Sequence, residues 1–116
     1  TLYSVYCMCG NRKAWREGDC YRMIWAEGRR CLSAKTNAVV LGHRYGQVRQ
    51  MDEWVIMCGE NKIMLIEDCA QAQGAKIENK YVGSFGDAGC FSFYPTKIIT
   101  TSEGGMLVTS NKRIFC

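Results

Sequence analysis

The sequence predicts an α/β fold in which helices flank a central, mostly parallel β-sheet. The main observation is a short crossover, in which an apolar run at 38–41 is followed by an amphipathic segment at 51–58 and a second apolar run at 63–66. Strand, helix and strand joined in this way are typical of a parallel sheet covered by helices. The composition agrees with one small globular domain, since 47% of the 116 residues are hydrophobic and 22% are charged.

The charge and hydropathy patterns indicate neither nucleic-acid nor membrane binding. The net charge is +4, and the 15 basic residues are not gathered in one run. No apolar stretch approaches the length that spans a bilayer, and the N-terminus lacks the basic and then apolar pattern of a signal peptide. The sequence therefore favours a cytoplasmic protein.

The 8 cysteines raise the alternatives of a disulfide framework and a zinc site. Four of them are widely spaced and lie mostly in apolar segments, where a free thiol packs as a small hydrophobic group: Cys58, Cys69, Cys90 and Cys116. The other four lie near the N-terminus: Cys7, Cys9, Cys20 and Cys31. The spacing of this second group matches no common zinc finger, so we assign no metal ligand and keep a small zinc-binding domain as an alternative.

The first 34 residues have the least regular pattern. Residues 2–8 are predicted to form a strand, and the polar residues 11–18 a loop. Residues 19–26 are predicted to form a short helix with Asp19 as its N-cap.

The pattern is sharper from residue 37 onward. Residues 38–41 read as a buried strand, and residues 42–50 as a loop. The helix at 51–58 places four apolar residues on one face: Met51, Trp54, Val55 and Cys58. Gly59 and Asn61 supply its stop signals.

The second buried strand, at 63–66, is followed directly by Glu67 and Asp68. Function in parallel sheets gathers at the carboxyl ends of the strands, so these acids mark a candidate site. Four further elements are predicted after them: a loop or single helical turn at 70–75, a hairpin at 77–82, an aromatic strand at 89–94 and a strand at 106–109.

Two residues limit these later elements. Pro95 ends the aromatic strand, because proline cannot donate a hydrogen bond to a sheet. Ser110 and Asn111 are predicted to cap a further helix near the end of the chain.

Lys97 is the first candidate for chemistry. It follows the aromatic strand and is flanked by Ile98 and Ile99. A charged amine in apolar surroundings is costly, so its pKa is expected to fall, and a neutral lysine is the nucleophile that forms Schiff bases. A lysine that extends from a strand end to solvent is the ordinary alternative.

Three other residues have an ordinary and a functional explanation. Asp68 could cap a helix, or hold the protonated nitrogen of a cofactor ring. Ser92 lies in an aromatic strand, where its hydroxyl would bind a backbone carbonyl or a phosphate. His43 is the sole histidine, and a lone histidine in a loop is more often structural, so we assign it no role.

Several segments, in order and at matching spacing, resemble motifs of the nucleotide-sugar aminotransferases of the DegT/DnrJ/StrS type. The cofactor-ring motif of that family is similar to IEDCAQAQGA at 66–75, and its next block to VGSFGD at 82–87. The Schiff-base motif is similar to FSFYPTK at 91–97, and the following turn to TSEGGM at 101–106. A family loop usually written His-Leu-Tyr-Gly is similar to HRYG at 43–46, and the match runs from about Lys35 to Asn111.

The resemblance implies a role for each of four residues. Lys97 would form a Schiff base with pyridoxal 5'-phosphate (PLP) and later move the substrate's proton. Asp68 would pair with the pyridine nitrogen of the cofactor, and Gln71 would hydrogen-bond its phenolic oxygen. Ser92 would bind its phosphate.

The resemblance also implies the fold and the activity. The fold would be part of the large domain of the aspartate-aminotransferase type (fold type I), with 35–116 as its central part and 1–34 as a diverged or unrelated segment. The intact enzyme, a homodimer, would transfer an amino group from glutamate or glutamine to a keto group of a nucleotide-linked sugar. A few relatives that lack the lysine perform dehydration instead, so Lys97 favours transamination.

The sequence departs from the family in two residues and in length. Gln73 stands where many members have histidine, and Arg44 where leucine is common; neither coincides with an assigned role. Members are several times longer, so we expect part of an enzyme, with a non-catalytic remnant or interaction module as the alternative. The sequence identifies neither the sugar, nor the nucleotide, nor the amino donor.

Overall fold

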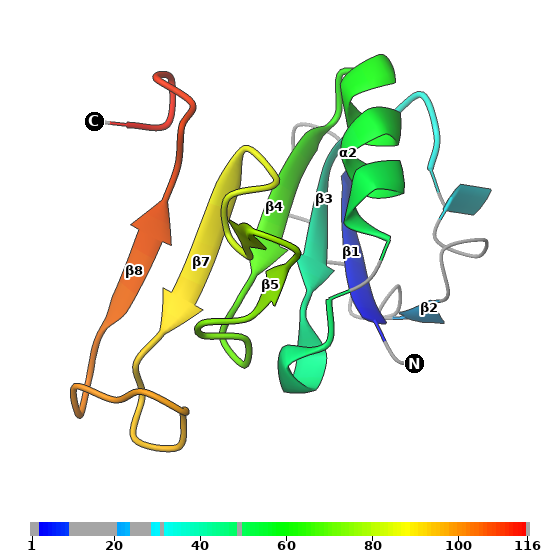
Figure 1. The fold of residues 1–116 in the computed structure, drawn as a ribbon. Coiled ribbons are helices and arrows are strands. Elements are labelled where there is room, and N and C mark those ends of the chain that lie inside the picture. The colour runs from blue at the N-terminus through cyan, green and yellow to red at the C-terminus, as the bar shows by residue number, and fades with distance from the viewer. Residues whose placement is uncertain (1–2, 10–20, 24–28, 31, 49, 116) are drawn as a thin grey trace.

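The computed structural model describes residues 3–9, 21–23, 29–30, 32–48 and 50–115. Six strands form the main sheet, in the spatial order β2 (Tyr21–Met23), β1 (Tyr3–Cys9), β3 (Thr36–Gly42), β4 (Met64–Asp68), β7 (Ala88–Ser92) and β8 (Gly105–Val108) (Figure 1). A separate hairpin is formed by β5 (Lys76–Ile77) and β6 (Lys80–Tyr81).

The centre of the sheet is parallel, as the sequence predicts. β4 pairs in parallel with β3 on one side and with β7 on the other. β1 and β8 run antiparallel to their central neighbours, and β2 runs antiparallel to β1. β2, β3, β4 and β7 therefore point in one direction, and their carboxyl ends lie along the same edge.

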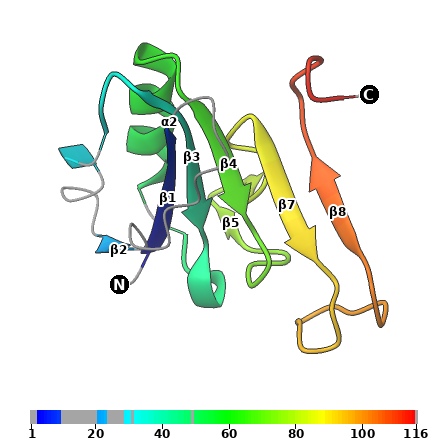
Figure 2. The ribbon, with the colours of Figure 1, turned by 180° about the vertical axis from the view of Figure 1, so that it is seen from behind.

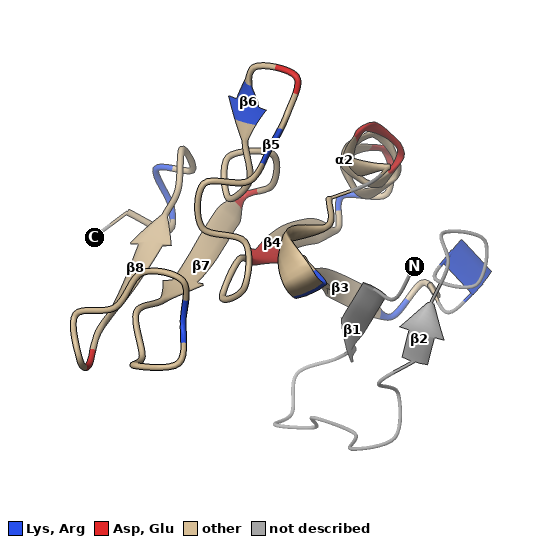
Figure 3. Ribbon diagram, turned by 60° about the horizontal axis from the view of Figure 1, so that its bottom comes forward, with Lys and Arg blue, Asp and Glu red and all other residues tan. Residues whose placement is uncertain are grey.

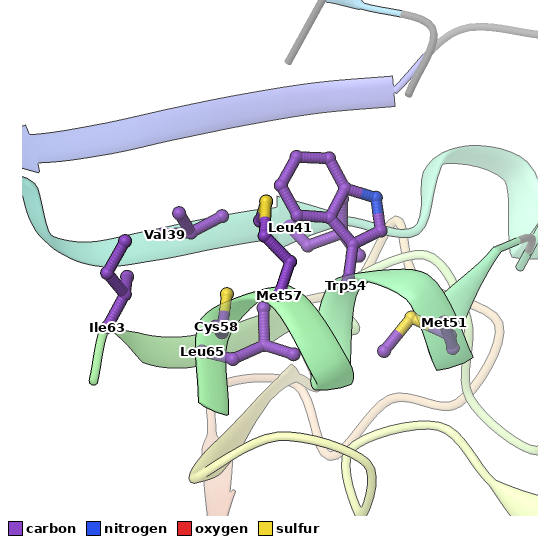
Figure 4. Packing of buried hydrophobic residues seen from close by; sticks show 8 residues of the cluster. All are labelled: Val39, Leu41, Met51, Trp54, Met57, Cys58, Ile63 and Leu65. Carbon is purple, nitrogen blue, oxygen red and sulfur yellow. The ribbon is translucent and has the colours of Figure 1, made fainter. Parts of the chain in front are cut away.

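The predicted crossover is present as β3, α2 (Met51–Glu60) and β4, and it contains the larger part of the core. Figure 4 shows the buried side chains between α2 and the two strands: Val39, Leu41, Met51, Trp54, Met57, Cys58, Ile63 and Leu65. The predicted helix face is wrong at one position, since Val55 is 38% exposed and Met57 is buried in its place. The buried stripe follows positions 51, 54, 57 and 58, so the helix faces the sheet at a slightly different angle than the predicted spacing implied.

The helix ends later than predicted. Gly59 lies inside α2, and the helix stops at Asn61, whose Nδ2 donates to the carbonyl of Met57 at 2.8 Å. Lys62 then takes a left-handed backbone conformation with φ 55 and turns the chain toward β4. Asn61 is thus the effective stop signal of the two that the sequence offers.

β4 extends two residues beyond its predicted end. Glu67 and Asp68 are its final residues, paired in register with Leu41 and Gly42 of β3. Because successive side chains of a strand point to opposite faces, Glu67 shares the face of Leu65 and the α2 core, and Asp68 lies on the other face.

The later strands follow the prediction with changed bounds, and the strand predicted at 106–109 is confirmed as β8, shifted by one residue. The hairpin forms at β5 and β6, and the aromatic strand ends at Ser92, not at Tyr94. The chain leaves the sheet there because Phe93 bonds within the next loop: its N–H donates to the carbonyl of Gly104 at 2.9 Å. Asn111 caps a turn and no helix follows within the described residues; its Oδ1 accepts the N–H of Arg113 at 3.0 Å.

The N-terminal part joins the same sheet. The predicted strand at 2–8 is confirmed as β1, whereas the helix predicted at 19–26 is wrong where it is described, because Tyr21–Met23 form β2. The free edge of β1 supplies backbone partners for this segment, which local sequence does not show. The loop predicted at 11–18 lies outside the described residues, as do the side chains of the candidate zinc ligands.

Helix α2 covers one face of the central strands (Figure 1), and Figure 2 shows the opposite face, which no helix of the described residues covers. Among those residues, no helix has the length and apolar character needed to cross a membrane.

Candidate functional site

A pocket of about 320 Å³ opens at the carboxyl edge of β3 and β4. It is lined by Gly42, His43, Arg44, Tyr45, Asp68, Ala70, Gln71 and Lys97. Figure 3 looks toward this edge and shows the acidic end of β4 between the basic residues of the turn after β3 and of the loop between β7 and β8. The volume falls within the range of roughly 300–1,000 Å³ usual for small-molecule sites.

Three of the four residues singled out from the sequence line this pocket. Asp68, Gln71 and Lys97 come together although they are separated by up to 29 positions along the chain. Ser92, at the end of β7, does not line it. The structure therefore brings Lys97, Asp68 and Gln71 together around one pocket, whereas Ser92 is not among the lining residues.

Asp68 keeps part of its carboxylate free. Its Oδ1 accepts the N–H of Ala70 at 3.1 Å, and its Oδ2 makes no hydrogen bond to the part of the chain that the structure describes. Cys90 is its register partner on β7, and burial and the Asp68 charge together raise the pKa of that thiol. An available carboxylate oxygen at a pocket can hold a protonated ring nitrogen.

Gln71 is oriented by the turn after β3. The N–H of Tyr45 donates to Gln71 Oε1 at 3.1 Å, so the amide nitrogen of Gln71 remains available as a donor. The turn, a single 3₁₀ turn η1 (Arg44–Gly46), has left-handed backbone at Tyr45 and at Gly46, with φ 57 and 70. A non-glycine residue in this region costs about 1 kcal/mol or more, and such strain is common where a backbone group serves a site.

Lys97 lies in an exposed loop. Its own N–H donates to the carbonyl of Tyr94 at 2.9 Å, which closes a turn after Pro95. Ile98 and Ile99 are 73% and 55% exposed, so they do not form the apolar surroundings expected from the sequence. That expectation fails because both side chains point away from the core of the described chain.

Ser92 is connected to the site through Gln73. Gln73 Nε2 donates to the carbonyl of Ser92 at 2.8 Å and to that of Ala70 at 3.2 Å. The Ser92 hydroxyl accepts the N–H of Tyr94 at 3.4 Å. Gln73 therefore connects the end of β7 to the turn after β4. It also hydrogen-bonds the backbone of Ser92, one of the four residues singled out from the sequence.

A buried pair beside the pocket was missed by the sequence reasoning. His43 Nε2 and Glu67 Oε2 lie 3.0 Å apart, and both side chains are 0% exposed. Glu67 also accepts backbone N–H groups from the segment before β7: Gly83 at 2.8 Å, Phe85 at 2.7 Å and Gly86 at 2.8 Å. Burial alone would raise the pKa of Glu67, but these bonds from His43 and the backbone outweigh it and hold that pKa below its usual range.

The pair was missed because its members are 24 positions apart and the histidine is alone of its type. A signal did exist in the strand pattern. Leu65 and Glu67 have the same parity, so the acid falls on the buried face, and a buried charge needs a partner.

Cys69 adds a third potential ligand to this pair. One ligand atom each from His43, Glu67 and Cys69 lies within 4.8 Å of the others. Both oxygens of Glu67 are already occupied by hydrogen bonds, and burial with the charges of Glu67 and Asp68 raises the pKa of the Cys69 thiol. A metal ion needs free carboxylate oxygens and a thiolate, so we assign none here.

The comparisons with known proteins agree on one family. The sequence pattern that defines the DegT/DnrJ/EryC1/StrS aminotransferase family matches residues 19–115. The GDP-perosamine synthase of Vibrio cholerae is 40% identical over 99 residues, which are 85% of this chain and 27% of that protein. A UDP-N-acetyl-3-dehydro-α-D-glucosamine 3-aminotransferase of Acidithiobacillus ferrooxidans is 39% identical over 95 residues, 81% of this chain and 26% of that protein.

The solved structures give the same result for the fold. TlmJ, an aminotransferase of Streptoalloteichus hindustanus, superposes with a TM-score of 0.72 at 31% identity over 74% of this chain and 24% of its own. PseC, an aminotransferase of Helicobacter pylori pseudaminic acid biosynthesis, has a TM-score of 0.69 at 30% identity over 73% of this chain and 23% of its own. An Escherichia coli GDP-4-keto-6-deoxy-D-mannose-3-dehydratase, solved with bound hydrated PLP, has a TM-score of 0.66 at 32% identity over 72% of this chain and 21% of its own.

The chain spans about a quarter of the length of these relatives. Its sheet and helix are those of part of a fold type I PLP-dependent aminotransferase domain, as the resemblance implies. With the family pattern matched over most of its length, the chain belongs to the DegT/DnrJ/EryC1/StrS aminotransferase family.

Proposed function

We propose that this chain is part of a PLP-dependent aminotransferase that moves an amino group from an amino acid to a keto group of a nucleotide-linked sugar. The observation that carries the proposal is the grouping of Lys97, Asp68 and Gln71 in one pocket at the carboxyl edge of the parallel strands. Two relatives, one named a GDP-perosamine synthase and one named an aminotransferase of a UDP-linked sugar, support the substrate class. Because the chain spans about a quarter of the length of these relatives, the activity of the whole protein is part of this proposal.

The free groups of the pocket fit PLP. Asp68 Oδ2 and the amide nitrogen of Gln71 have no partner in the described chain, and they offer an acceptor for the ring nitrogen and a donor for the phenolic oxygen. When bound, PLP supplies an electron sink that stabilises negative charge at the substrate carbon. Asp68 keeps the ring nitrogen protonated, which that role requires.

Lys97 supplies the amine. In the proposed enzyme Lys97 Nζ would hold the cofactor covalently, and as a free amine it would take a proton from the amino donor and return one to the sugar. Among the described residues Nζ makes no ion pair, so the amine is not held by a carboxylate. Ser92 is proposed to donate its hydroxyl proton to the phosphate, with the family resemblance as support.

The remaining parts of the proposal concern the whole protein. We assign residues 35–116 to the centre of the PLP-binding large domain and 1–34 to a diverged segment before it. A homodimer, a glutamate or glutamine donor and a cytoplasmic location come with the family resemblance.

Reductive trapping tests the proposal. The purified chain is incubated with PLP, reduced with borohydride and digested, and the labelled peptide is found by mass spectrometry. We expect the label on Lys97, and its loss in Lys97→Ala without transfer to other lysines. Lys112→Ala is the matched control, because Lys112 is exposed and does not line the pocket.

A non-catalytic remnant of the family predicts a different result. Scattered labelling of surface lysines, or none, would contradict the proposal and favour the remnant. Equal loss of label in Lys97→Ala and Lys112→Ala would do the same.

A further inference from the structure

Arg44 is a second cation on the pocket wall. The charged residues that line the pocket are Arg44, Lys97 and Asp68, so cations outnumber carboxylates there. Within the part of the chain that the structure describes, Arg44 makes no ion pair, and the contact of an acid with a basic side chain is the hydrogen bond between His43 and Glu67. Arg44 therefore lines the pocket without an ion pair to any carboxylate of the described residues.

The backbone around Arg44 is fixed on both sides. The N–H of His43 donates to the carbonyl of Asp68 at 3.0 Å, and the N–H of Tyr45 donates to Gln71 Oε1 at 3.1 Å. The carbonyl of Arg44 itself accepts the N–H of Gln47 at 3.1 Å. Although the Arg44 side chain is exposed, the backbone on both sides of it is held by Asp68 and Gln71, which also line the pocket.

We propose that Arg44 binds an oxyanion, a carboxylate or a phosphate, of the ligand that occupies this pocket. A guanidinium stays charged at all relevant pH values and presents paired N–H donors that match both groups. The proposal rests on the proposed function for the identity of the ligand, since the amino donor carries a carboxylate and PLP carries a phosphate.

Lys97 does not compete for this role. In the proposed function its amine is joined to the cofactor, so Arg44 is the lining cation that remains for an anion. A guanidinium at this position would therefore favour anionic ligands in this pocket.

The first test uses inorganic phosphate and does not depend on PLP. Backbone amide shifts of the full chain are followed by NMR during a phosphate titration, for the wild type, Arg44→Leu and Arg113→Leu. Arg113 is an exposed arginine after β8 that does not line the pocket, so its replacement removes the same charge elsewhere.

In the wild type and in Arg113→Leu we expect saturating shifts at the amides of 43–46, and roughly tenfold weaker binding in Arg44→Leu. Equal affinities in all three proteins, or equal weakening in both variants, would overturn the proposal. Either result is independent of whether Lys97 is labelled by PLP, so the two proposals can fail separately.

The second test separates the two sources of the oxyanion. If Arg44 contacts the cofactor, Arg44→Leu weakens the binding of PLP but not of pyridoxal, which lacks the phosphate. If it contacts the amino donor, binding of both is unchanged, and glutamate binds the PLP-loaded variant more weakly while propylamine, which has no carboxylate, does not. The proposal would be overturned if Arg44→Leu weakened the binding of PLP and pyridoxal equally, and that of glutamate and propylamine equally.

Discussion

The two sides of the pocket are held in different ways. The strand-end side, residues 42–46 and 67–71, is tied together by the buried His43–Glu67 pair and by two backbone N–H groups after β3, which donate to the Asp68 carbonyl and to Gln71 Oε1. The lysine loop, residues 93–104, is held by short local bonds, such as those from Lys97 to Tyr94 and from Thr101 to Phe93. Most of its side chains are exposed.

One side of the pocket therefore contributes to the stability of the fold, and the other carries the reactive amine. The strand-end side places Asp68 and Gln71 as a consequence of folding, so its disruption should lower the stability of the chain. The lysine loop carries the proposed nucleophile, but little of the core depends on it. Substitutions on the two sides should therefore separate folding from cofactor attachment.

The largest effect is expected for Glu67→Ala. This change removes the acceptor of the buried His43 side chain and of three backbone N–H groups, and breaking a buried pair typically costs about 3–5 kcal/mol. Urea denaturation of the full chain measures the free energy of unfolding. Glu103→Ala, in the exposed lysine loop, is the control and should change it by no more than about 0.5 kcal/mol. Similar losses in the two variants would contradict the division.

Gly89→Ala should have the next largest effect. A Cβ at Gly89 would collide with the backbone of Gly83, whose N–H donates to Glu67. Forcing this segment apart should cost about 1–3 kcal/mol by the same denaturation measurement. Gly59→Ala is the matched control, since its Cβ would meet nothing within 4 Å inside α2, and alanine there should stabilise by about 0.5–1 kcal/mol. If Gly89→Ala is neutral, the strand-end side is not packed as described.

Acid should weaken the strand-end side through Glu67. Because the pKa of this carboxyl is lowered on folding, its contribution to stability is present above the ordinary value of 4.5 and is lost as the pH falls below that value through the folded pKa. Unfolding free energies of the wild type and Glu67→Gln, measured across this range, should converge as the pH falls. A difference that stays constant with pH would show that the ionised carboxylate is not the stabilising form.

The smallest effect on stability is expected for Lys97→Ala. The side chain is half-buried and makes no ion pair within the described chain, so the free energy of unfolding should change by no more than about 0.5 kcal/mol. The same variant should lose the specific PLP label. A loss of stability as large as that of Glu67→Ala would mean that the lysine loop supports the fold after all.

Much of this architecture can be predicted from local pattern. The apolar runs around Val39 and Leu65 and the helix stripe that includes Trp54 are short-range signals, and they gave the parallel core. The helix predicted at 19–26 failed because β2 depends on the edge of β1, a partner outside the segment. The family motifs indicated Asp68, Gln71 and Lys97, but His43 and Glu67 required the register of β3 against β4.

Native-state hydrogen exchange of the full chain tests the division between the two sides most directly. We expect slow exchange at the amides of Gly83, Phe85 and Gly86, which donate to the buried Glu67, and fast exchange at those of Lys97 and Thr101. Addition of PLP should slow exchange in the lysine loop and leave the first group nearly unchanged. Equal protection of both groups without PLP, or a lysine loop that PLP leaves unprotected, would contradict this division.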